Sequence, residues 1–284
     1  MTATKRRVDI TTPTGMHIAA DEWPGSGPAV VLAHGGGQTR HSWGGTAGVL
    51  ADHGHRVMSI DLRGHGDSDW APDGDYHMSA YRDDALAVVR SIGSPVAWVG
   101  ASLGGMTGLH AVDEAPELFS SLVLVDITPR PAAAGVSRIL EFMAKDAADG
   151  FATLDDAADA IAEYQPHRPR PDDLSGLSKN LRLGEDGRWR WHWDPAFLNI
   201  RTGGTSEHAR DRHHDDLEQI ARRLTLPTLL IRGKLSDLVT EDEVTDFLEM
   251  VPHARYVDVA NAAHMIAGDR NDVFTDAVVS FLAS

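Results

Sequence analysis

The sequence predicts an α/β fold built on a mostly parallel sheet, and three observations lead to this prediction. Short apolar runs bounded by turn residues recur through the first half of the chain and again near its end. Segments with helical spacing separate these runs, and alternating strands and helices imply crossover connections. A stretch of about 100 residues in the middle breaks the alternation and has the character of an insertion. A chain of 284 residues is long enough to bury the core of one large domain with such an insertion.

Seven segments are expected to form strands. Four of them are nearly continuously apolar, which is typical of strands covered on both faces. They are Ala29–Ala33, Val57–Asp61, Val96–Gly100 and Leu122–Asp126. The other three are Met16–Trp23, Thr228–Arg232 and Arg255–Val259.

Helical patterns follow most of these strands, and one helix start can be placed precisely. Thr240 with Glu243 three residues later has the pattern of a capping box. The helices expected around the sheet are Thr46–His53, Ser79–Ile92, Leu103–Glu114 and Asp272–Leu282.

The middle of the chain, residues 129–226, is predicted to be a cap that covers one end of the sheet, with residues 1–128 and 227–284 forming the core. A β-hairpin is expected where Asn180–Leu183 and Arg188–Trp193 flank the turn Gly184–Gly187. The helices expected in this region are Val136–Asp149, Leu154–Tyr164 and His208–Leu224.

Composition restricts the kinds of partner. The formal net charge of −16 disfavours nucleic acid and anionic membrane surfaces, so a small uncharged or cationic molecule is the expected ligand. The absence of cysteine excludes disulfides, thiolate nucleophiles and cysteine-ligated metals. With no signal peptide or membrane-spanning run recognised, we expect a cytoplasmic monomer or homodimer without a cofactor. His208, His213 and His214 beside Asp215 and Asp216 are interpreted as a solvated helix face, so no metal is expected.

Ser102 is the candidate nucleophile. Gly100-Ala101-Ser102-Leu103-Gly104 fits the pattern G-x-S-x-G, between an expected strand and an expected helix. A nucleophile elbow places a serine in a strained turn, where small neighbours let the backbone fold tightly. A glycine-rich turn with a solvent-facing serine is the alternative.

A serine nucleophile needs a base and an acid that orients the base. His264 is the candidate base, because it lies in a loop of small residues after the last expected strand. Asp237, just past Thr228–Arg232, is the preferred acid, and Asp126, at the end of its strand, is the alternative acid.

The predicted oxyanion hole combines two backbone amides. Leu103 N–H would come from the start of the helix after Ser102, and Gly36 N–H from the loop His34-Gly35-Gly36-Gly37, with Gly37 as the fallback. The glycine run fits neither common phosphate-binding pattern, so nucleotide binding is discounted.

Together these motifs resemble the α/β-hydrolase superfamily, in particular its small capped members. The resemblance also includes Asp61-Leu62-Arg63-Gly64-His65-Gly66-Asp67-Ser68 and spans about residues 30 to 270. It implies an eight-stranded, mostly parallel sheet with a mainly helical cap, a structural role for Asp61 and Arg63, and a bracing role for His34. Epoxide hydrolases and haloalkane dehalogenases of this fold carry aspartate where this chain has Ser102, so acyl transfer through serine is favoured.

Aromatic residues of the cap are candidates for the substrate pocket. Trp189, Trp191 and Trp193 alternate, so a hairpin would place them on one face, with Phe197 close behind. They form either an aromatic wall over Ser102 or the packing of cap on core. The substrate-binding residues predicted are Gly37, Trp43, Met106 and Trp191.

The predicted function is hydrolysis of a carboxylic ester, or a related acyl bond, of a small, largely apolar substrate through an acyl-enzyme. Two alternatives use the same fold. One is a cofactor-free perhydrolase or oxygenase, or a C–C bond hydrolase, with the same triad. The other is a ligand-binding member without catalysis.

Overall fold

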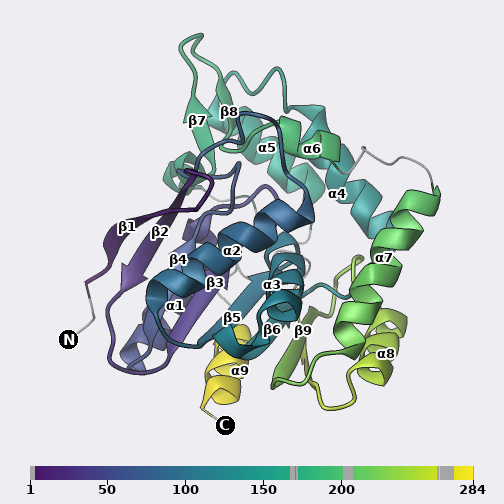
Figure 1. The fold of residues 1–284 in the computed structure, drawn as a ribbon. Coiled ribbons are helices and arrows are strands. Elements are labelled where there is room, and N and C mark those ends of the chain that lie inside the picture. Colours follow the sequence, from purple (N-terminus) through teal and green to yellow (C-terminus); the bar gives the residue numbers. More distant parts are fainter. Residues whose placement is uncertain are drawn as a thin grey trace.

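A computed structural model describes residues 4–166, 170, 172–200, 207–260, 262 and 272–283. Its centre is an eight-stranded sheet with the order β1-β2-β4-β3-β5-β6-β9-β10 (Figure 1). β2 runs antiparallel to both of its neighbours, and every other pair is parallel. The strands are β1 (Arg6–Thr11), β2 (His17–Trp23), β3 (Ala29–Ala33), β4 (Arg56–Ile60), β5 (Val96–Ala101), β6 (Phe119–Val125), β9 (Thr228–Gly233) and β10 (Arg255–Val259). This is the mostly parallel, eight-stranded sheet that the resemblance implies.

The strand that the sequence analysis does not include is β1. Four of its six residues, Arg6, Arg7, Asp9 and Thr11, are exposed, because β1 lies at the edge of the sheet and pairs with β2 alone. A search for apolar runs finds strands buried on both faces and misses an edge strand of this kind.

Helices cover both faces of the sheet. One face carries α1 (Gly44–Asp52) and α9 (Asp272–Leu282), and the other carries α2 (Met78–Ile92), α3 (Leu103–Glu114), α7 (Glu207–Arg222) and α8 (Glu241–Met250). Side chains alternate along each strand, so β3 sends Val31 to the α3 side and Val30 and Leu32 to the α1 side. The three-residue and four-residue 3₁₀ helices Pro116–Leu118 and Arg40–Trp43 complete the connections.

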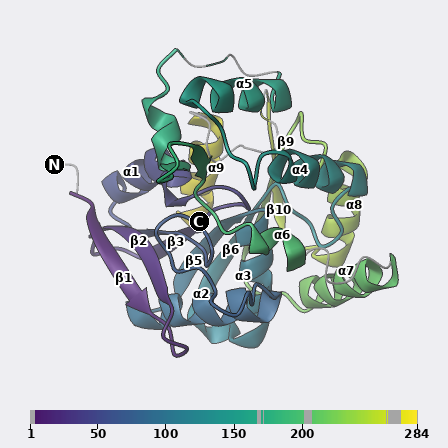
Figure 2. The same cartoon turned by 90° about the horizontal axis from the view of Figure 1, so that it is seen from above.

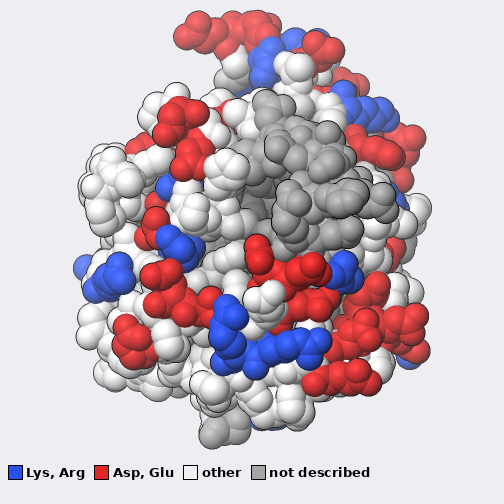
Figure 3. Space-filling view, turned by 45° about the vertical axis from the view of Figure 1, so that its right-hand side comes forward, with Lys and Arg blue, Asp and Glu red and all other residues white. Residues whose placement is uncertain are grey.

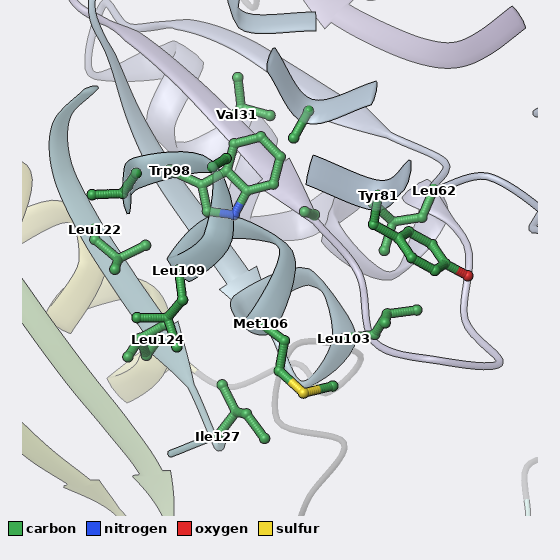
Figure 4. Close-up of a cluster of buried hydrophobic side chains, with 14 of the residues drawn as sticks. Val31, Leu62, Tyr81, Trp98, Leu103, Met106, Leu109, Leu122, Leu124 and Ile127 are labelled. Carbon is green, nitrogen blue, oxygen red and sulfur yellow. The ribbon is translucent and has the colours of Figure 1, made fainter. Parts of the chain in front are cut away.

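The core on the α3 side is organised around Trp98 of β5. Figure 4 shows the Trp98 ring among aliphatic side chains from β3, β6 and α3. Its Nε1 donates a hydrogen bond of 2.9 Å to the carbonyl of Gly104 in the first turn of α3. This bond joins the interior of the sheet to the helix that follows Ser102.

The elements of the predicted cap lie above the sheet in Figure 1 and are seen from above in Figure 2, and this segment is called the cap below. Its elements are α4 (Ala133–Lys145), α5 (Leu154–Tyr164), the 3₁₀ helix Ser175–Lys179, β7 (Leu181–Leu183), β8 (Trp189–Trp191) and α6 (Ala196–Ile200). β7 and β8 form the expected hairpin, and α5 has the predicted bounds.

α7 differs from its predicted place in the insertion. Its residues Leu217, Ile220 and Ala221 are buried in the core cluster, and the helix contacts α3 and α8. By its packing α7 therefore belongs to the helical layer of the core. The sequence shows α7 to be a polar amphipathic helix but does not show which surface covers its apolar face.

The predicted capping box at the start of α8 (Glu241–Met250) is confirmed, because Glu243 accepts a 2.8 Å hydrogen bond from the N–H of Thr240. Among the helices that the structure describes, none is long and apolar enough to cross a membrane.

Two glycine-to-alanine substitutions should have opposite effects on stability. A Cβ on Gly104 would lie 2.3 Å from the carbonyl oxygen of Ala33. Gly104→Ala should therefore lower the free energy of unfolding by about 1–3 kcal/mol or more. A Cβ on Gly48, inside α1, meets no atom within 4 Å, so Gly48→Ala should raise it by up to about 1 kcal/mol. Urea unfolding of both variants measures the effects. Equal stability of the two variants would contradict the prediction.

Candidate active site

Ser102 occupies a strained turn between β5 and α3. Its backbone has φ 45° and ψ −109°, a conformation that side-chain-bearing residues seldom adopt. Its N–H donates to Val125 O at 3.1 Å, and its carbonyl accepts from Met106 N–H at 3.0 Å. Ser102 is partly exposed, although the residues on both sides of it are buried. A nucleophile elbow has a strained turn of this kind between a strand and a helix, so the geometry favours the catalytic interpretation of Ser102 over a glycine-rich turn with a solvent-facing serine.

Asp126 follows the neighbouring strand β6, and its backbone angle φ is positive, as that of Ser102 is. Within the described residues, Ser102 and Asp126, with φ 51°, are the two non-glycine positions at which φ is positive. Val125 pairs with Ala101, so the two residues leave adjacent strands side by side. The buried carboxylate of Asp126 accepts hydrogen bonds from Gly233 N–H at 3.1 Å and from the hydroxyl of Ser236 at 2.6 Å.

Asp237 has a different environment. Its side chain is 42% exposed and accepts a 2.8 Å hydrogen bond from Arg138 of the cap helix α4. The backbone beside it also holds the cap, because Ala132 N–H donates to Leu238 O at 2.9 Å. This environment makes Asp237 a contact between cap and core and favours the alternative acid, Asp126.

His264, the predicted base, lies outside the described residues. Ala262, two residues before it in the sequence, is described and is buried. The carbonyl of Ala262 accepts a 2.8 Å hydrogen bond from Leu235 N–H. Ala262 is therefore attached to the loop that carries Ser236, the hydroxyl partner of Asp126.

The glycine loop, residues 34–37 after β3, lies against the turn at Ser102, and the amides of Gly35 and Gly37 are both hydrogen-bonded. A Cβ on Gly35 would lie 3.4 Å from the Cβ of Ser102, and Gly104 N–H donates to His34 O at 3.1 Å. Gly35 N–H donates to Gln38 Oε1 at 2.9 Å, and Gly37 N–H donates to His65 Nε2 at 3.1 Å.

In the part of the chain that the structure describes, the amides of Gly36 and Leu103 have no hydrogen-bond partner. They are the two predicted oxyanion donors, and an oxyanion hole needs donors that are not engaged elsewhere. The fallback donor, Gly37, is occupied by His65. Its use in the oxyanion hole is therefore not favoured.

His34 braces this loop as a neutral imidazole. Its Nε2 accepts from Leu62 N–H at 3.0 Å, so its Nδ1 carries the proton and donates to Gly35 O at 2.8 Å. Burial, helped by the nearby charge of Arg40, lowers the pKa of His34 to about 4. Burial and the neighbouring His34 lower the pKa of His65 to about 3. The resemblance implies the bracing role of His34, whereas the sequence alone assigns no role to His65.

Asp61 and Arg63 have the structural roles that the resemblance implies. The buried carboxylate of Asp61 accepts from the N–H of Arg40 at 2.6 Å and from the Arg40 guanidinium. Arg63 donates two hydrogen bonds, of 2.6 and 2.9 Å, to Asp84. These pairs fix the loop that follows β4, next to the glycine loop.

Three cap side chains close over the glycine loop. A Cβ on Gly36 would lie 3.2 Å from Phe197 Cζ, and one on Gly37 would lie 3.1 Å from Met143 Cε and 3.8 Å from Trp193 Nε1. Phe197, Met143 and Trp193 are all almost fully buried. They form an apolar cover beside the predicted oxyanion hole. Met143 was not predicted, because its helical spacing does not show which neighbour it contacts.

The other predicted pocket residues have different surroundings. Trp43 is fully buried on the α1 side, 5.9 Å from the ring of Phe274, so it packs in the core, and its predicted contact with a substrate stays a prediction. Trp191 packs within the cap, 5.3 Å from Phe151 and 5.9 Å from Phe142.

Met106 is nearly buried on α3 and lies near Ile127 in Figure 4. Of the three alternating tryptophans, Trp193 alone is in contact range of the glycine loop among the described contacts.

The histidine-rich start of α7 is only partly described, and the side chains of His208 and His213 lie outside it. Asp215 pairs with Arg130 at 2.8 Å. The described residues contain no group of three or more histidines, aspartates or glutamates placed to hold a metal ion.

Comparisons with known proteins agree on one family. The family model described as alpha/beta hydrolase fold matches residues 28–270. Esterase Rv0045c of Mycobacterium tuberculosis is 30% identical over 263 residues, which cover 89% of this chain and 82% of the relative. A 3-hydroxybutyrate-oligomer hydrolase of Cupriavidus necator is 26% identical, with 90% of each chain covered. The crystal structure of an E-2-(acetamidomethylene)succinate hydrolase aligns with a TM-score of 0.83 at 21% identity, covering 99% of this chain and 100% of that one.

The buried histidines should make stability depend on pH. His34 has a pKa of about 4 in the fold and an ordinary value of 6.5 when unfolded, so between these values the unfolded chain binds more protons. The free energy of unfolding should therefore fall as the pH is lowered from 7 to 5, and the share of His34 should be about 2 kcal/mol. Urea unfolding at both pH values measures this loss. The loss of free energy of unfolding between pH 7 and pH 5 should be smaller in His34→Gln than in the wild type. Equal stability of the wild type at the two pH values would contradict the prediction.

Proposed function

Because the chain belongs to the alpha/beta hydrolase fold family, whose relatives named above are hydrolases, we propose that it is a serine esterase acting on small, largely apolar carboxylic esters. The strained turn at Ser102 carries this proposal, because it holds a partly exposed serine at the start of α3, whose first amide has no hydrogen-bond partner among the described residues. The Mycobacterium tuberculosis relative is named an esterase, which favours an ester over another acyl bond.

In the proposed mechanism, Ser102 Oγ attacks the ester carbonyl while His264 takes its proton. We assign the base to His264 from its place in the sequence. The Gly36 and Leu103 amides hydrogen-bond to the oxyanion of the tetrahedral intermediate. The alcohol leaves with the proton from His264, and a water molecule activated by the same histidine then releases the acid.

We assign the acid to Asp126 and not to Asp237. Asp126 is buried, leaves the strand next to that of Ser102, and has its carboxylate fixed by two uncharged donors. Asp237 is engaged with the cap through Arg138. A buried, oriented carboxylate is what the triad needs, because it must hold the imidazole in one tautomer and stabilise the imidazolium.

The apolar cover of Phe197, Met143 and Trp193 supports a largely apolar substrate. The net charge of −16 and the acidic side chains spread over the face in Figure 3 also favour an uncharged substrate over an anionic one.

Removing the nucleophile tests the proposal directly. Ser102→Ala should lower kcat for p-nitrophenyl esters by about 10⁴-fold or more, because the covalent route is lost. Steady-state kinetics over a series of acyl lengths, with labelling by a fluorophosphonate probe, provide the measurement. A folded Ser102→Ala protein that keeps near-normal turnover would overturn the function.

Two aspartate-to-asparagine variants decide between the acids. Asp126→Asn should lower kcat by about 10³–10⁴-fold, as expected when the histidine loses its orienting carboxylate. Asp237→Asn should stay within about threefold of the wild type, because that carboxylate is half-exposed and pairs with Arg138. Circular dichroism of both variants controls for folding. If Asp237→Asn disables the enzyme and Asp126→Asn does not, the assignment is wrong.

A further inference from the structure

His65 lies between the glycine loop and the cap, and its hydrogen bonds fix its protonation. Nδ1 lies 3.0 Å from the carbonyl of Arg63, which can only accept, so Nδ1 carries the proton. Nε2 is then free to accept the hydrogen bond of 3.1 Å from Gly37 N–H. The side chain is fully buried, so water does not compete for either bond.

His65 Nε2 binds the peptide group that follows Gly36 in the chain. Gly37 has φ +79°, and its N–H belongs to the peptide that also carries the carbonyl of Gly36. With Gly35 N–H bonded to Gln38 and Gly37 N–H bonded to His65, the loop is held on both sides of Gly36. The direction of the Gly36 N–H is therefore set by its neighbours, since it has no partner of its own in the described part of the chain.

The cap contacts the same imidazole. The ring of Phe197 meets that of His65 edge-on, with centroids 4.9 Å apart and an interplanar angle of 71°. His65 also forms an antiparallel bridge with Trp193. Hydrogen bonds of 2.8 Å from Gly66 N–H to His192 O and from Asp194 N–H to Gly64 O attach the cap on either side of this bridge.

We propose that His65 is a positioning residue of the hydrolytic site, which fixes the Gly36 amide of the oxyanion hole by accepting the N–H of Gly37 and is itself held in place by the cap. This proposal rests on the proposed function. It adds a residue that touches no substrate and acts through the glycine loop. By fixing the Gly36 amide, His65 stabilises the tetrahedral intermediates of both acylation and deacylation, in which the oxyanion forms.

Two substitutions separate the acceptor from the ring. His65→Phe keeps an aromatic ring against Phe197 but removes the acceptor, and should lower kcat for p-nitrophenyl esters about 10–100-fold with KM changed less than threefold. His65→Gln places a carbonyl oxygen near the position of Nε2 and should recover kcat to within about fivefold of the wild type. A role in packing alone predicts the opposite order.

A second measurement reports on the oxyanion hole without turnover. An alkylboronic acid forms a tetrahedral adduct with a catalytic serine, so its inhibition constant should rise in His65→Phe by about the factor by which kcat/KM falls, and should change little in His65→Gln. If His65→Phe does not fold, His65→Leu takes its place. His192→Gln is the matched control, because His192 is also nearly buried and its Nε2 has no hydrogen-bond partner within the described residues. Its kcat should not change.

Wild-type kcat in a folded His65→Phe protein, or equal losses in His65→Phe and His65→Gln, would overturn the role of His65. Ser102→Ala, measured in parallel, distinguishes failure of the positioning role of His65 from failure of the esterase function. An inactive Ser102→Ala with an unchanged His65→Phe removes only the positioning role, whereas an active Ser102→Ala removes the esterase function itself.

Discussion

The close approach of α3 to the ends of β3 and β5 is the constraint on which the rest of the molecule depends. A Cβ on Gly100 would lie 2.3 Å from Gly104 O, and one on Gly104 would lie 2.3 Å from Ala33 O. No side chain fits at either position. The glycines thereby bring the first turn of α3 against the glycine loop, and the strained backbone of Ser102 is stabilised by the packing around it.

Much of the fold could be predicted from local patterns, because the central strands are buried on both faces and their apolar runs are visible in the sequence. The acid could not be settled in the same way. Asp126 and Asp237 both follow strands, and either one gives the order serine, acid, histidine. What separates them is the hydroxyl of Ser236, which bonds to Asp126, whereas the next residue, Asp237, turns to Arg138. The order of residues along a chain does not show which of two adjacent polar side chains points inward.

In the cap, too, the sequence predicts the elements but not their contacts. The hairpin and its turn could be predicted, but the alternation of its tryptophans did not show what each ring contacts. β8 ends at Trp191, and Trp193 lies beyond it in a bridge to His65, so the two rings belong to different surroundings. His65 was overlooked for a related reason. Its motif implied a structural loop, and the contact with Gly37 joins residues 28 positions apart.

The proposed acid, Asp126 after β6, restricts how this scaffold can vary. The proposed nucleophile and acid follow neighbouring paired strands, whose spacing of about 4.8 Å keeps the two residues close together. The end of β9 and the loop after it hold the carboxylate of Asp126 through Gly233 N–H and the Ser236 hydroxyl, and the next residues, Asp237 and Leu238, contact the cap. Asp237 and Leu238 contact the cap but are not points where the chain enters it, so replacing α4 with a different helix would require matching changes at these two positions, while the paired strands β5 and β6 stay as they are.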